Sequence, residues 1–354
     1  MENKTKYCIG VMSGTSLDGI DIAYVKLSYE ASFQFEIIKA VTIPYHPDWK
    51  KALKNGFHLS GEALTKLDAD YGIFLGNTLK SFISENNIDH IDFIASHGHT
   101  IYHNPSESYT LQIGNGPYIN AITGVKTICN FRVQDIALGG QGAPLVPIGD
   151  ALLFSKYDYC LNLGGFSNIS MKENDLRIAY DICPVNIVLN HYVNSLNLEY
   201  DNNGEIASTG TIETNLLEEL NELPFYNDVK PKSLGYEFIV ETIFPIINKY
   251  NLKTKDILRT FVEHIAMQIA KKIESNSSKT MLIAGGGAYN GFLIERLQSY
   301  TKTQLIIPND EIINYKEALV FALLGYLKNE EKNNCLKSVT GASKNHSSGI
   351  IYNA

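Results

Sequence analysis

One pattern occurs twice in this chain: an apolar run, a short tip of small residues, and a second apolar run. The first copy occupies residues 7–27 and has glycine, hydroxyl and carboxylate residues at its tip. The second occupies residues 157–171 and has Gly164 and Gly165 at its tip. Two apolar runs separated by a glycine-containing tip are typical of a β-hairpin. The repetition therefore predicts two halves built on one plan, each opening with a hairpin.

Strand and helix signals alternate after both hairpins, which predicts an α/β fold. In the first half a strand at 33–43 follows the hairpin, so three antiparallel strands are expected to open the chain. The other elements expected there are a long amphipathic helix at 61–86 and strands at 91–96, 109–113 and 125–129. In the second half we expect strands at 176–180 and 281–284, and helices at 184–196, 237–250, 254–274 and around 292–297.

The 354 residues of the chain are enough for two domains with cores of ordinary size. Glycine and proline are concentrated between residues 131 and 149, which predicts a hinge in this segment. We expect a first domain at residues 1–131, joined by the C-terminal tail 340–354, and a second domain at residues 132–339.

The composition excludes several classes of partner. A net charge of −8 disfavours nucleic acid and anionic membranes, because neither attracts an acidic protein. No apolar stretch has the length of a signal peptide core or a membrane span. The five cysteines are widely spaced and include no C-x-x-C pair, so neither a disulfide framework nor a zinc site is indicated. A reducing cytoplasm is the expected location.

The tip of the first hairpin is a candidate phosphate site. Gly14 lets backbone N–H groups converge on an anion, and the hydroxyl groups of Thr15 and Ser16 add donors. Asp18 or Asp21 would hold Mg²⁺ through water, because this ion prefers oxygen ligands and keeps part of its hydration shell. An ordinary hairpin turn has the same composition, and neither G-x-x-x-x-G-K-[ST] nor G-x-G-x-x-G occurs here.

Two further glycine segments extend this hypothesis. Gly164 and Gly165, at the tip of the second hairpin, would clamp a polyphosphate from the other side of a cleft. A triple glycine at residues 285–287 lies between an expected strand and an expected helix. Such a segment lets a flat ring approach the backbone, and the helix N-terminus favours anions.

Asp181 is a candidate general base, because it follows the expected strand at 176–180, at the mouth of a cleft. The alternative is that it caps the helix after Pro184. Cys183 has no specific base in evidence, so we expect a small buried thiol and not a nucleophile.

His97, His99 and His103 form an H-x-H-x-x-x-H cluster just after a strand. A metal site is one interpretation, but no fourth ligand lies within sequence reach, so substrate positioning is favoured. Glu317 immediately precedes an apolar run typical of a buried helix. Its charge must be solvated, paired or used by a ligand, unless it only contacts the N-terminus of the helix.

Three segments carry a family resemblance: GVMSGTSLDG at 10–19, DIALGGQGAPLVP at 135–147 and SVTGAS at 338–343. Together they resemble the anhydro-N-acetylmuramic acid kinases, and the similarity extends over nearly the whole chain. The resemblance implies the two-domain α/β fold shared by actin, Hsp70 and sugar kinases, with a duplicated sheet and ATP in an interdomain cleft. It also implies that water opens the 1,6-anhydro ring of a muropeptide-derived sugar and that ATP phosphorylates the freed 6-hydroxyl oxygen. The products would be N-acetylmuramate 6-phosphate and ADP.

The resemblance also implies roles by position. Asp181 corresponds to the carboxylate that activates water, and the guanidinium of Arg132 suits the lactyl carboxylate of the sugar. The other positions implied to contact the sugar are His97, Gln141 and Glu317. The positions implied to contact ATP are Gly14, Thr15, Ser16, Leu17, Asp18, Gly19, Ile20 and Asp21 at the phosphates, Gly164 and Gly165 at the second phosphate hairpin, and Gly285, Gly286 and Gly287 at the adenosine.

The chain departs from the family pattern in three places. The usual D-T-G-P-G-N reads D-I-C-P-V-N at residues 181–186, the arginines that commonly follow Arg132 are replaced by Val133 and Gln134, and His99 stands where glutamine is usual. Two alternatives therefore stay open: a kinase of a different sugar or small acid on the same fold, and a non-catalytic ATP-gated module. In the enzymatic interpretations the partner is a small-molecule sugar, without nucleic acid or membrane, and a homodimer is compatible with the sequence.

Overall fold

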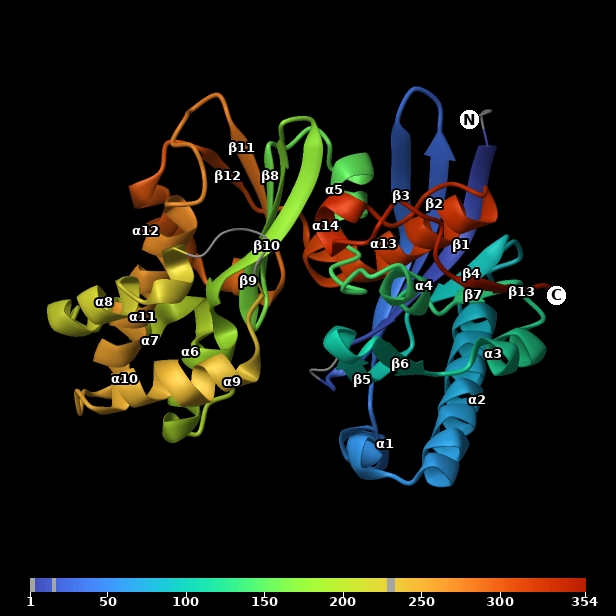
Figure 1. Ribbon diagram of the computed structural model, residues 1–354, viewed down its shortest axis with the longest axis horizontal. Coiled ribbons are helices and arrows are strands. Elements are labelled where there is room, and N and C mark those ends of the chain that lie inside the picture. The colour runs from blue at the N-terminus through green and yellow to red at the C-terminus, as the bar shows by residue number, and fades with distance from the viewer. Residues whose placement is uncertain (1–3, 15–16, 228–232) are drawn as a thin grey trace. The chain divides into compact units, whose positions relative to one another are not determined.

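A computed structural model of the protein describes residues 4–14, 17–227 and 233–354. The chain divides into two compact units, which we call unit 1 and unit 2. Unit 1 contains Met1–Leu153 and Tyr315–Ala354, and unit 2 contains Phe154–Asn314. Each unit is an α/β structure built on its own sheet (Figure 1).

The sheet of unit 1 is made of β1 (Lys4–Ser13), β2 (Gly19–Tyr29), β3 (Phe33–Pro44), β4 (Phe93–Ser96), β7 (Thr127–Cys129) and β13 (Ile350–Tyr352). The strand order is β13-β7-β4-β1-β2-β3. Strands β1, β2 and β3 pair antiparallel, β4 pairs parallel with β1, and β7 pairs parallel with β4. Three antiparallel strands therefore open the chain, as predicted.

The helices of unit 1 are α1 (Pro47–Asn55), α2 (Gly61–Glu85), α3 (Gly116–Thr123), α4 (Val133–Ala137), α5 (Pro147–Leu153), most of α13 (Asp310–Asn329) and α14 (Lys337–Thr340). A separate two-stranded ribbon consists of β5 (His99–Asn104) and β6 (Tyr109–Ile113). The predicted long helix is confirmed as α2. It begins after Ser60, whose side chain accepts the N–H of Ala63.

Helices α2 and α13 pack on opposite faces of β1. Tyr71 and Leu75 of α2 belong to one buried cluster with Val11 of β1. Because neighbouring residues of a strand point to opposite faces, Gly10 faces away from α2. A Cβ atom on Gly10 would lie 1.8 Å from the carbonyl oxygen of Ala318 in α13. Only glycine lets the backbone of α13 approach the strand this closely.

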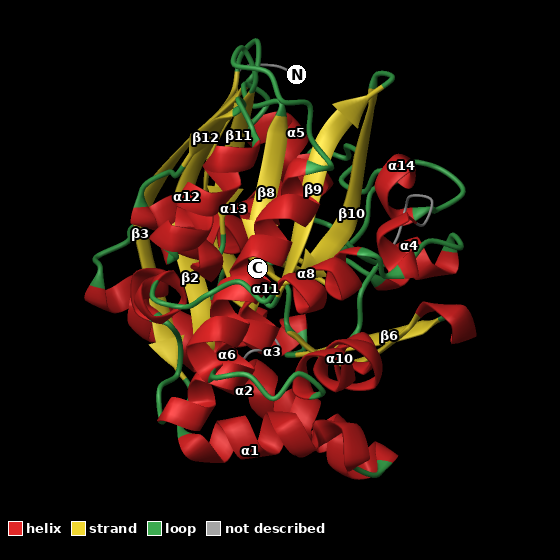
Figure 2. Cartoon of the chain, turned by 90° about the vertical axis from the view of Figure 1, so that its left-hand side faces the viewer, coloured by secondary structure: helices red, strands yellow, loops and turns green. Residues whose placement is uncertain are grey.

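The sheet of unit 2 is made of β8 (Tyr159–Leu163), β9 (Phe166–Glu173), β10 (Leu176–Pro184), β11 (Thr280–Ala284) and β12 (Gln304–Ile306), in the order β10-β9-β8-β11-β12. Strands β8, β9 and β10 pair antiparallel, β11 pairs parallel with β8, and β12 pairs parallel with β11 (Figure 2). The same pairings join β1, β2, β3, β4 and β7 in the sheet of unit 1. The predicted duplication is therefore confirmed.

The helices of unit 2 are α6 (Asn186–Val193), α7 (Glu205–Ser208), α8 (Thr214–Asn221), α9 (Tyr236–Phe238), α10 (Phe244–Asn248), α11 (Thr254–Ala270) and α12 (Gly291–Tyr300). The predicted helix at 237–250 contains a π-helical turn, Ile239–Ile243, between α9 and α10. Helix α11 contributes Phe261 and Ile265 to the core of the unit. Within the described part of the chain, every helix is too short or too polar to cross a bilayer.

The unit boundaries of the structure differ from those expected from the sequence. Residues 132–153 and 315–339, expected in the second domain, pack with unit 1. The expected hinge at 131–149 lies wholly inside this unit, where the backbone N–H of Gly142 donates to Asp135 Oδ2 at 2.7 Å. Asp135 Oδ1 accepts the hydroxyl of Thr340 at 2.7 Å. The glycine and proline residues thus belong to a loop that hydrogen bonds hold in place.

Candidate functional site

The hairpin tip of unit 2 presents open backbone. Gly164 donates its N–H to the carbonyl of Phe166 at 3.1 Å, and Val185 donates its N–H to the carbonyl of Gly165 at 2.8 Å. A Cβ atom on Gly165 would meet nothing nearer than Ile187 Cβ, at 3.7 Å, which is ordinary contact. The packing of the protein therefore does not require glycine at this exposed position, whereas a ligand that approaches the backbone would.

The triple glycine follows β11, which is the parallel neighbour of β8, so it lies beside the tip of that hairpin. Gly285 has φ +82°, and a Cβ atom on Gly287 would lie 2.7 Å from Leu163 Cβ. Both are required by the local backbone and packing. Gly286 is exposed, and among the described residues a Cβ atom there would have only Asn186 Nδ2 within 4 Å, at 3.9 Å. The structure thus brings together two glycine segments that the sequence separates by 120 residues.

Asp181 lies inside β10 and not after a strand, because β10 continues to Pro184. The pairing of β10 with β9 shifts register between Asp181 and Cys183, and such a bulge redirects side chains. Asp181 Oδ2 accepts the N–H of Leu234 at 2.8 Å. Burial raises the pKa of the Asp181 carboxyl above its usual value, and this hydrogen bond opposes the rise. The cap of helix α6 is Val185, so the interpretation of Asp181 as its N-cap is wrong.

The departures from the family pattern beside Asp181 face the core. Ile182, Cys183 and Val185 are completely buried within one hydrophobic cluster. Cys183 Sγ lies 3.2 Å from the Ser167 hydroxyl oxygen, and the prediction of a small buried thiol is confirmed. These residues therefore contribute to the packing beneath the strand, and Asp181 is not part of that cluster.

In unit 1, Arg132 and His97 form a pair. Arg132 donates from Nε to His97 Nε2 at 3.0 Å and from Nη1 to the carbonyl of Gly142 at 2.6 Å. His97 Nδ1 donates to the carbonyl of Gly98 at 2.9 Å. Burial, and then the positive charge of Arg132, hold the pKa of His97 well below its usual value. One ring nitrogen of His97 thus contacts Arg132, and the hydrogen bond of the other to Gly98 fixes the orientation of the ring.

A cavity of about 180 Å³ adjoins this pair, and its lining includes His97, Gln112 and Asn130. The other two histidines of the cluster have separate partners. His99 Nδ1 lies 3.0 Å from the Ser13 hydroxyl oxygen, and His103 Nδ1 lies 3.1 Å from that of Thr110. Among the described residues these histidines do not form a metal-ligand group.

Glu317 lies in the interior of helix α13, which begins at Asp310. An interaction with the helix N-terminus therefore does not explain its charge. The residue as a whole is exposed, yet the surrounding protein desolvates its carboxyl group and so raises the pKa of Glu317. The positive charge of Arg132 opposes this rise. The next residue towards the N-terminus, Lys316, is buried and pairs with Asp150 at 2.6 Å. Glu317 and Arg132 thus act on each other electrostatically within unit 1.

The first hairpin tip is described in part, and Thr15 and Ser16 lie outside the described residues. Leu17 donates its N–H to the carbonyl of Gly14 at 3.4 Å, with φ +60°. Gly19 and Ile20 are buried, and a Cβ atom on Gly19 would lie 2.5 Å from the carbonyl oxygen of Ile43. Close packing against β3 therefore explains Gly19, and burial in the core explains Ile20.

Asp18 and Asp21 form a negatively charged pair at the base of this tip. Asp18 is exposed, and Asp21 Oδ1 accepts the hydroxyl of Thr42 at 2.6 Å. Burial raises the pKa of Asp21, and the negative charge of Asp18 adds to the rise. Mutual repulsion of two carboxylates is relieved by a cation, so this donor set fits a hydrated Mg²⁺.

Gln141 is exposed on the glycine-rich loop, and its backbone N–H donates to the carbonyl of Thr340 at 2.8 Å. Sequence reasoning missed the two residues that hold this loop, Asp135 and Thr340. Both lie in segments that carry the family resemblance, but nothing in the sequence indicates that residues 205 positions apart share a hydrogen bond.

Comparisons with known sequences agree on one family. The family model for anhydro-N-acetylmuramic acid kinase matches residues 6–354. The chain is 36% identical to the anhydro-N-acetylmuramic acid kinase of Pasteurella multocida, covering 99% of this chain and 98% of the relative. It is 35% identical to that of Crocosphaera subtropica over 98% of both chains. A glucokinase of Streptomyces griseus solved with glucose and AMPPNP gives a TM-score of 0.42 at 10% identity, over 90% of this chain and 98% of that one.

Proposed function

Because the chain belongs to the anhydro-N-acetylmuramic acid kinase family, we propose that it is an ATP-dependent kinase of 1,6-anhydro-N-acetylmuramic acid. It opens the anhydro ring with water and phosphorylates the freed O6, giving N-acetylmuramate 6-phosphate and ADP. This reaction recycles sugar from cell-wall peptidoglycan. One observation supports the residue assignment: the carboxylate of Asp181 is half-buried and lies next to a strand bulge that changes the direction of side chains. The same unit contains the two glycine segments.

Asp181 is the general base of this proposal. Its carboxylate takes a proton from water while the water oxygen forms a bond to the anomeric carbon and the bond from that carbon to O6 breaks. O6 then forms a bond to the γ-phosphorus, and the bond to the ADP oxygen breaks. The hydrogen bond from Leu234 fixes Oδ2, which leaves Oδ1 to accept the proton.

The glycine segments of unit 2 contribute backbone to the nucleotide site. Gly164, Gly165 and Gly286 have room beside their Cα atoms, so a phosphate or adenosine can approach the backbone there, although the N–H of Gly164 is already donated to the carbonyl of Phe166. In unit 1, the segment from Gly14 to Asp21 contacts the phosphates of ATP, with Asp18 and Asp21 holding Mg²⁺ through water. When bound, ATP supplies the phosphoryl group and Mg²⁺ supplies positive charge against the charge that develops on it.

Residues of unit 1 bind the sugar. Arg132 pairs with the lactyl carboxylate, and its guanidinium is held in orientation by His97 and by the carbonyl of Gly142. His97 therefore acts through Arg132. Glu317 and Gln141 are exposed and accept or donate hydrogen bonds to sugar hydroxyl or acetamido groups.

A substrate screen with oxygen labelling tests the reaction. Purified full-length protein with Mg²⁺ and ATP should release ADP steadily with 1,6-anhydro-N-acetylmuramic acid. Ring-opened N-acetylmuramic acid should be a poor substrate even though its 6-hydroxyl is free. It lacks the anhydro bond whose cleavage by water releases O6 as the nucleophile. In ¹⁸O-water, promptly quenched product should carry label on the anomeric hydroxyl and none in the phosphate. Rapid phosphorylation of the ring-opened sugar, or label in the phosphate, would contradict the coupled reaction and favour an ordinary sugar kinase.

The proposal also includes a cytoplasmic enzyme that forms a homodimer. Its co-substrate ATP is cytoplasmic, and its sugar is a small soluble molecule. Cell fractionation tests the location, and sedimentation velocity of the full chain at micromolar concentration tests the homodimer. A monomer at the concentration used for kinetics would remove the dimer from the proposal without affecting the chemistry.

A further inference from the structure

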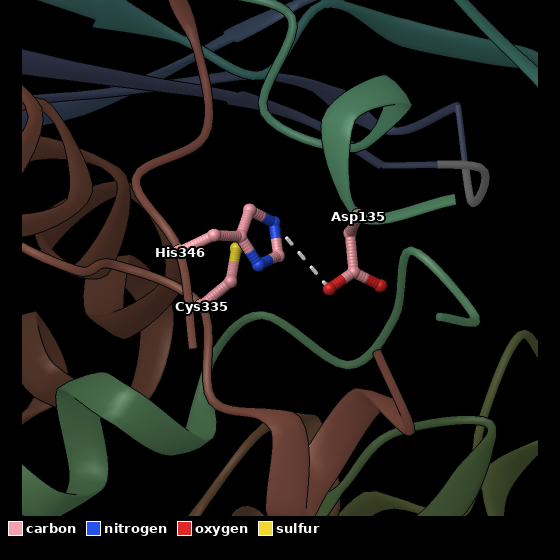
Figure 3. A group of neighbouring side chains, drawn as sticks. All are labelled: Asp135, Cys335 and His346. Atoms are coloured by element: carbon pink, nitrogen blue, oxygen red, sulfur yellow. Dashed lines mark ion pairs between the residues drawn. The ribbon is translucent and has the colours of Figure 1, made fainter. Parts of the chain in front are cut away.

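Three side chains outside the kinase site converge in the interior of unit 1: Asp135, Cys335 and His346 (Figure 3). Asp135 lies on α4, whereas Cys335 and His346 belong to the C-terminal segment. Their exposed fractions are 0%, 2% and 7%. One oxygen of Asp135, the sulfur of Cys335 and one ring nitrogen of His346 all lie within 4.8 Å of one another. Among the described residues this is the one group of its kind.

The backbone holds these side chains in place. Cys335 and His346 form an isolated antiparallel bridge, with N–H to carbonyl distances of 3.1 Å and 3.3 Å. Asp135 is fixed from the other side by the hydroxyl of Thr340 on Oδ1 and by the N–H of Gly142 on Oδ2. The cluster therefore joins the glycine-rich loop to the C-terminal segment.

The imidazole of His346 points to a missing partner. Its Nδ1 donates to the carbonyl of Lys344 at 3.3 Å, as the second nitrogen of a metal-binding histidine commonly does. This leaves a lone pair on Nε2, which is buried and has no hydrogen-bond partner among the described residues. Nε2 faces Asp135 Oδ1 at 3.6 Å, as Figure 3 shows. A lone pair that faces a carboxylate is unfavourable unless a proton or a metal ion lies between them.

We propose that Asp135, Cys335 and His346 bind one Zn²⁺ ion through Oδ1, Sγ and Nε2. Carboxylate, thiolate and imidazole are its ordinary ligands, and bond lengths of about 2.0 Å in a tetrahedral site place oxygen and nitrogen ligands about 3.3 Å apart. The observed 3.6 Å between Oδ1 and Nε2 needs only a small contraction. A water completes the four-coordinate site.

The ion would connect the glycine-rich loop, which carries candidate sugar contacts, to the C-terminal segment. Arg132 is the residue before α4, and Gln141 follows the loop from Asp135. A bond from Zn²⁺ to all three ligands connects this loop to residues more than 190 positions further along the chain. The site is therefore structural, and its ion is not a participant in phosphoryl transfer.

Binding releases one proton. Burial, and then the negative charge of Asp135, raise the pKa of the Cys335 thiol to about 12 without an ion. The thiol must lose its proton to become a ligand.

Metal titration of the full-length apo-protein, without nucleotide or sugar, tests this site. One equivalent of Zn²⁺ should bind and raise Tm, and Co²⁺ should produce a thiolate-to-cobalt charge-transfer band. Cys335→Ser should abolish the band, and His346→Gln should weaken Zn²⁺ binding at least tenfold. The matched control is Cys129→Ser, a half-buried cysteine of the same unit outside the cluster, which should bind like the wild type.

Three results would overturn the proposal. These are no stoichiometric Zn²⁺ or Co²⁺ binding, full binding retained in both cluster variants, or an NMR titration in which His346 is an imidazolium paired with Asp135 at neutral pH. If Cys335→Ser fails to fold by circular dichroism, His346→Gln supplies the decision. Kinase activity is not a readout here, so failure of the proposed reaction would leave this test unaffected.

Discussion

The two units share the order and directions of five strands, and unit 1 adds β13 at one edge, but the connections of their first hairpins differ. In unit 1, residues 14–18 connect β1 to β2, and the turn and the start of β2 carry two carboxylates. In unit 2, only Gly164 and Gly165 connect β8 to β9. A shared sheet thus supports two different surfaces: charged side chains in unit 1 and bare backbone in unit 2. The sheet is a scaffold, and the chemistry resides in segments that the duplication did not preserve.

The glycines of the two units show the same division. Gly10 of unit 1 is required because the backbone of α13 approaches it, whereas Gly165 of unit 2 has free space where a side chain would lie. One glycine serves packing and the other leaves room for a ligand. Substitution of Gly10 should therefore affect stability, whereas substitution of Gly165 should affect ligand binding.

The largest effect should come from Asp181→Asn in unit 2. The amide cannot take a proton from water, so kcat should fall about 10³-fold while ATP binding is retained. The matched control is Asp201→Asn, a buried carboxylate of the same unit that accepts the N–H groups of Ile206 and Ala207. The control should lose stability and keep its turnover. Near-wild-type turnover in Asp181→Asn would exclude the base and leave the bulge without a catalytic role.

The same substitution has a second, opposite readout. Because burial raises the pKa of Asp181 in the folded state, ionisation of this carboxyl opposes folding above its usual pKa. Asp181→Asn should therefore raise Tm at pH 7, and the gain should vanish in acid, where the carboxyl is protonated in both states. Equal Tm values at both pH values would show that the carboxylate is not desolvated.

Gly10→Ala and Gly165→Ala should separate packing from ligand binding. The added methyl group at Gly10 collides with the backbone of α13 and should destabilise the protein by about 3 kcal/mol or more, with the KM for ATP unchanged in the folded fraction. At Gly165 the stability should change by less than about 0.5 kcal/mol, while the KM for ATP rises about tenfold. Chemical denaturation and ATP kinetics on both variants provide the measurements. An unchanged KM at Gly165 would remove this tip from the nucleotide site.

Arg132→Gln should affect the sugar and not the nucleotide. Loss of a charge-assisted pair with a carboxylate costs about 1.5–3 kcal/mol, so the KM for the anhydrosugar should rise about 10- to 100-fold. The matched control is Arg177→Gln in unit 2, which removes a guanidinium bonded to Ser170 and should leave this KM unchanged. Equal effects of Arg132→Gln on both substrates would assign it a structural role.

The sequence predicted the scaffold better than the site. Runs of apolar residues and glycine tips are local signals, so both hairpins and α2 were predictable from neighbouring residues. The unit boundaries were not, because α13 packs against Gly10 through contacts more than 300 positions apart. The pairing of His97 with Arg132 and the convergence of Asp135 with His346 are likewise products of the folded chain. Widely spaced cysteines indicated no metal site, since spacing cannot reveal ligands that tertiary structure assembles.

The last expected effect concerns stability in mild acid, and it is absent at neutral pH. His264 of unit 2 is completely buried, and its Nε2 accepts the hydroxyl of Tyr226 at 2.8 Å while Nδ1 donates to Asn221. Burial lowers the pKa of His264 to about 3, below its value of about 6.5 in the unfolded chain. The unfolded state therefore binds a proton first, and stability falls as pH decreases from about 6.5 towards 3, by about 1.4 kcal/mol per pH unit for this group.

His264→Gln should lose that part of the slope in urea denaturation between pH 6 and 4, whereas His191→Gln, an exposed histidine of the same unit, should keep it. An unchanged slope in His264→Gln would place the acid sensitivity elsewhere, with His99 of unit 1, whose pKa burial lowers to about 4, as the next residue to replace.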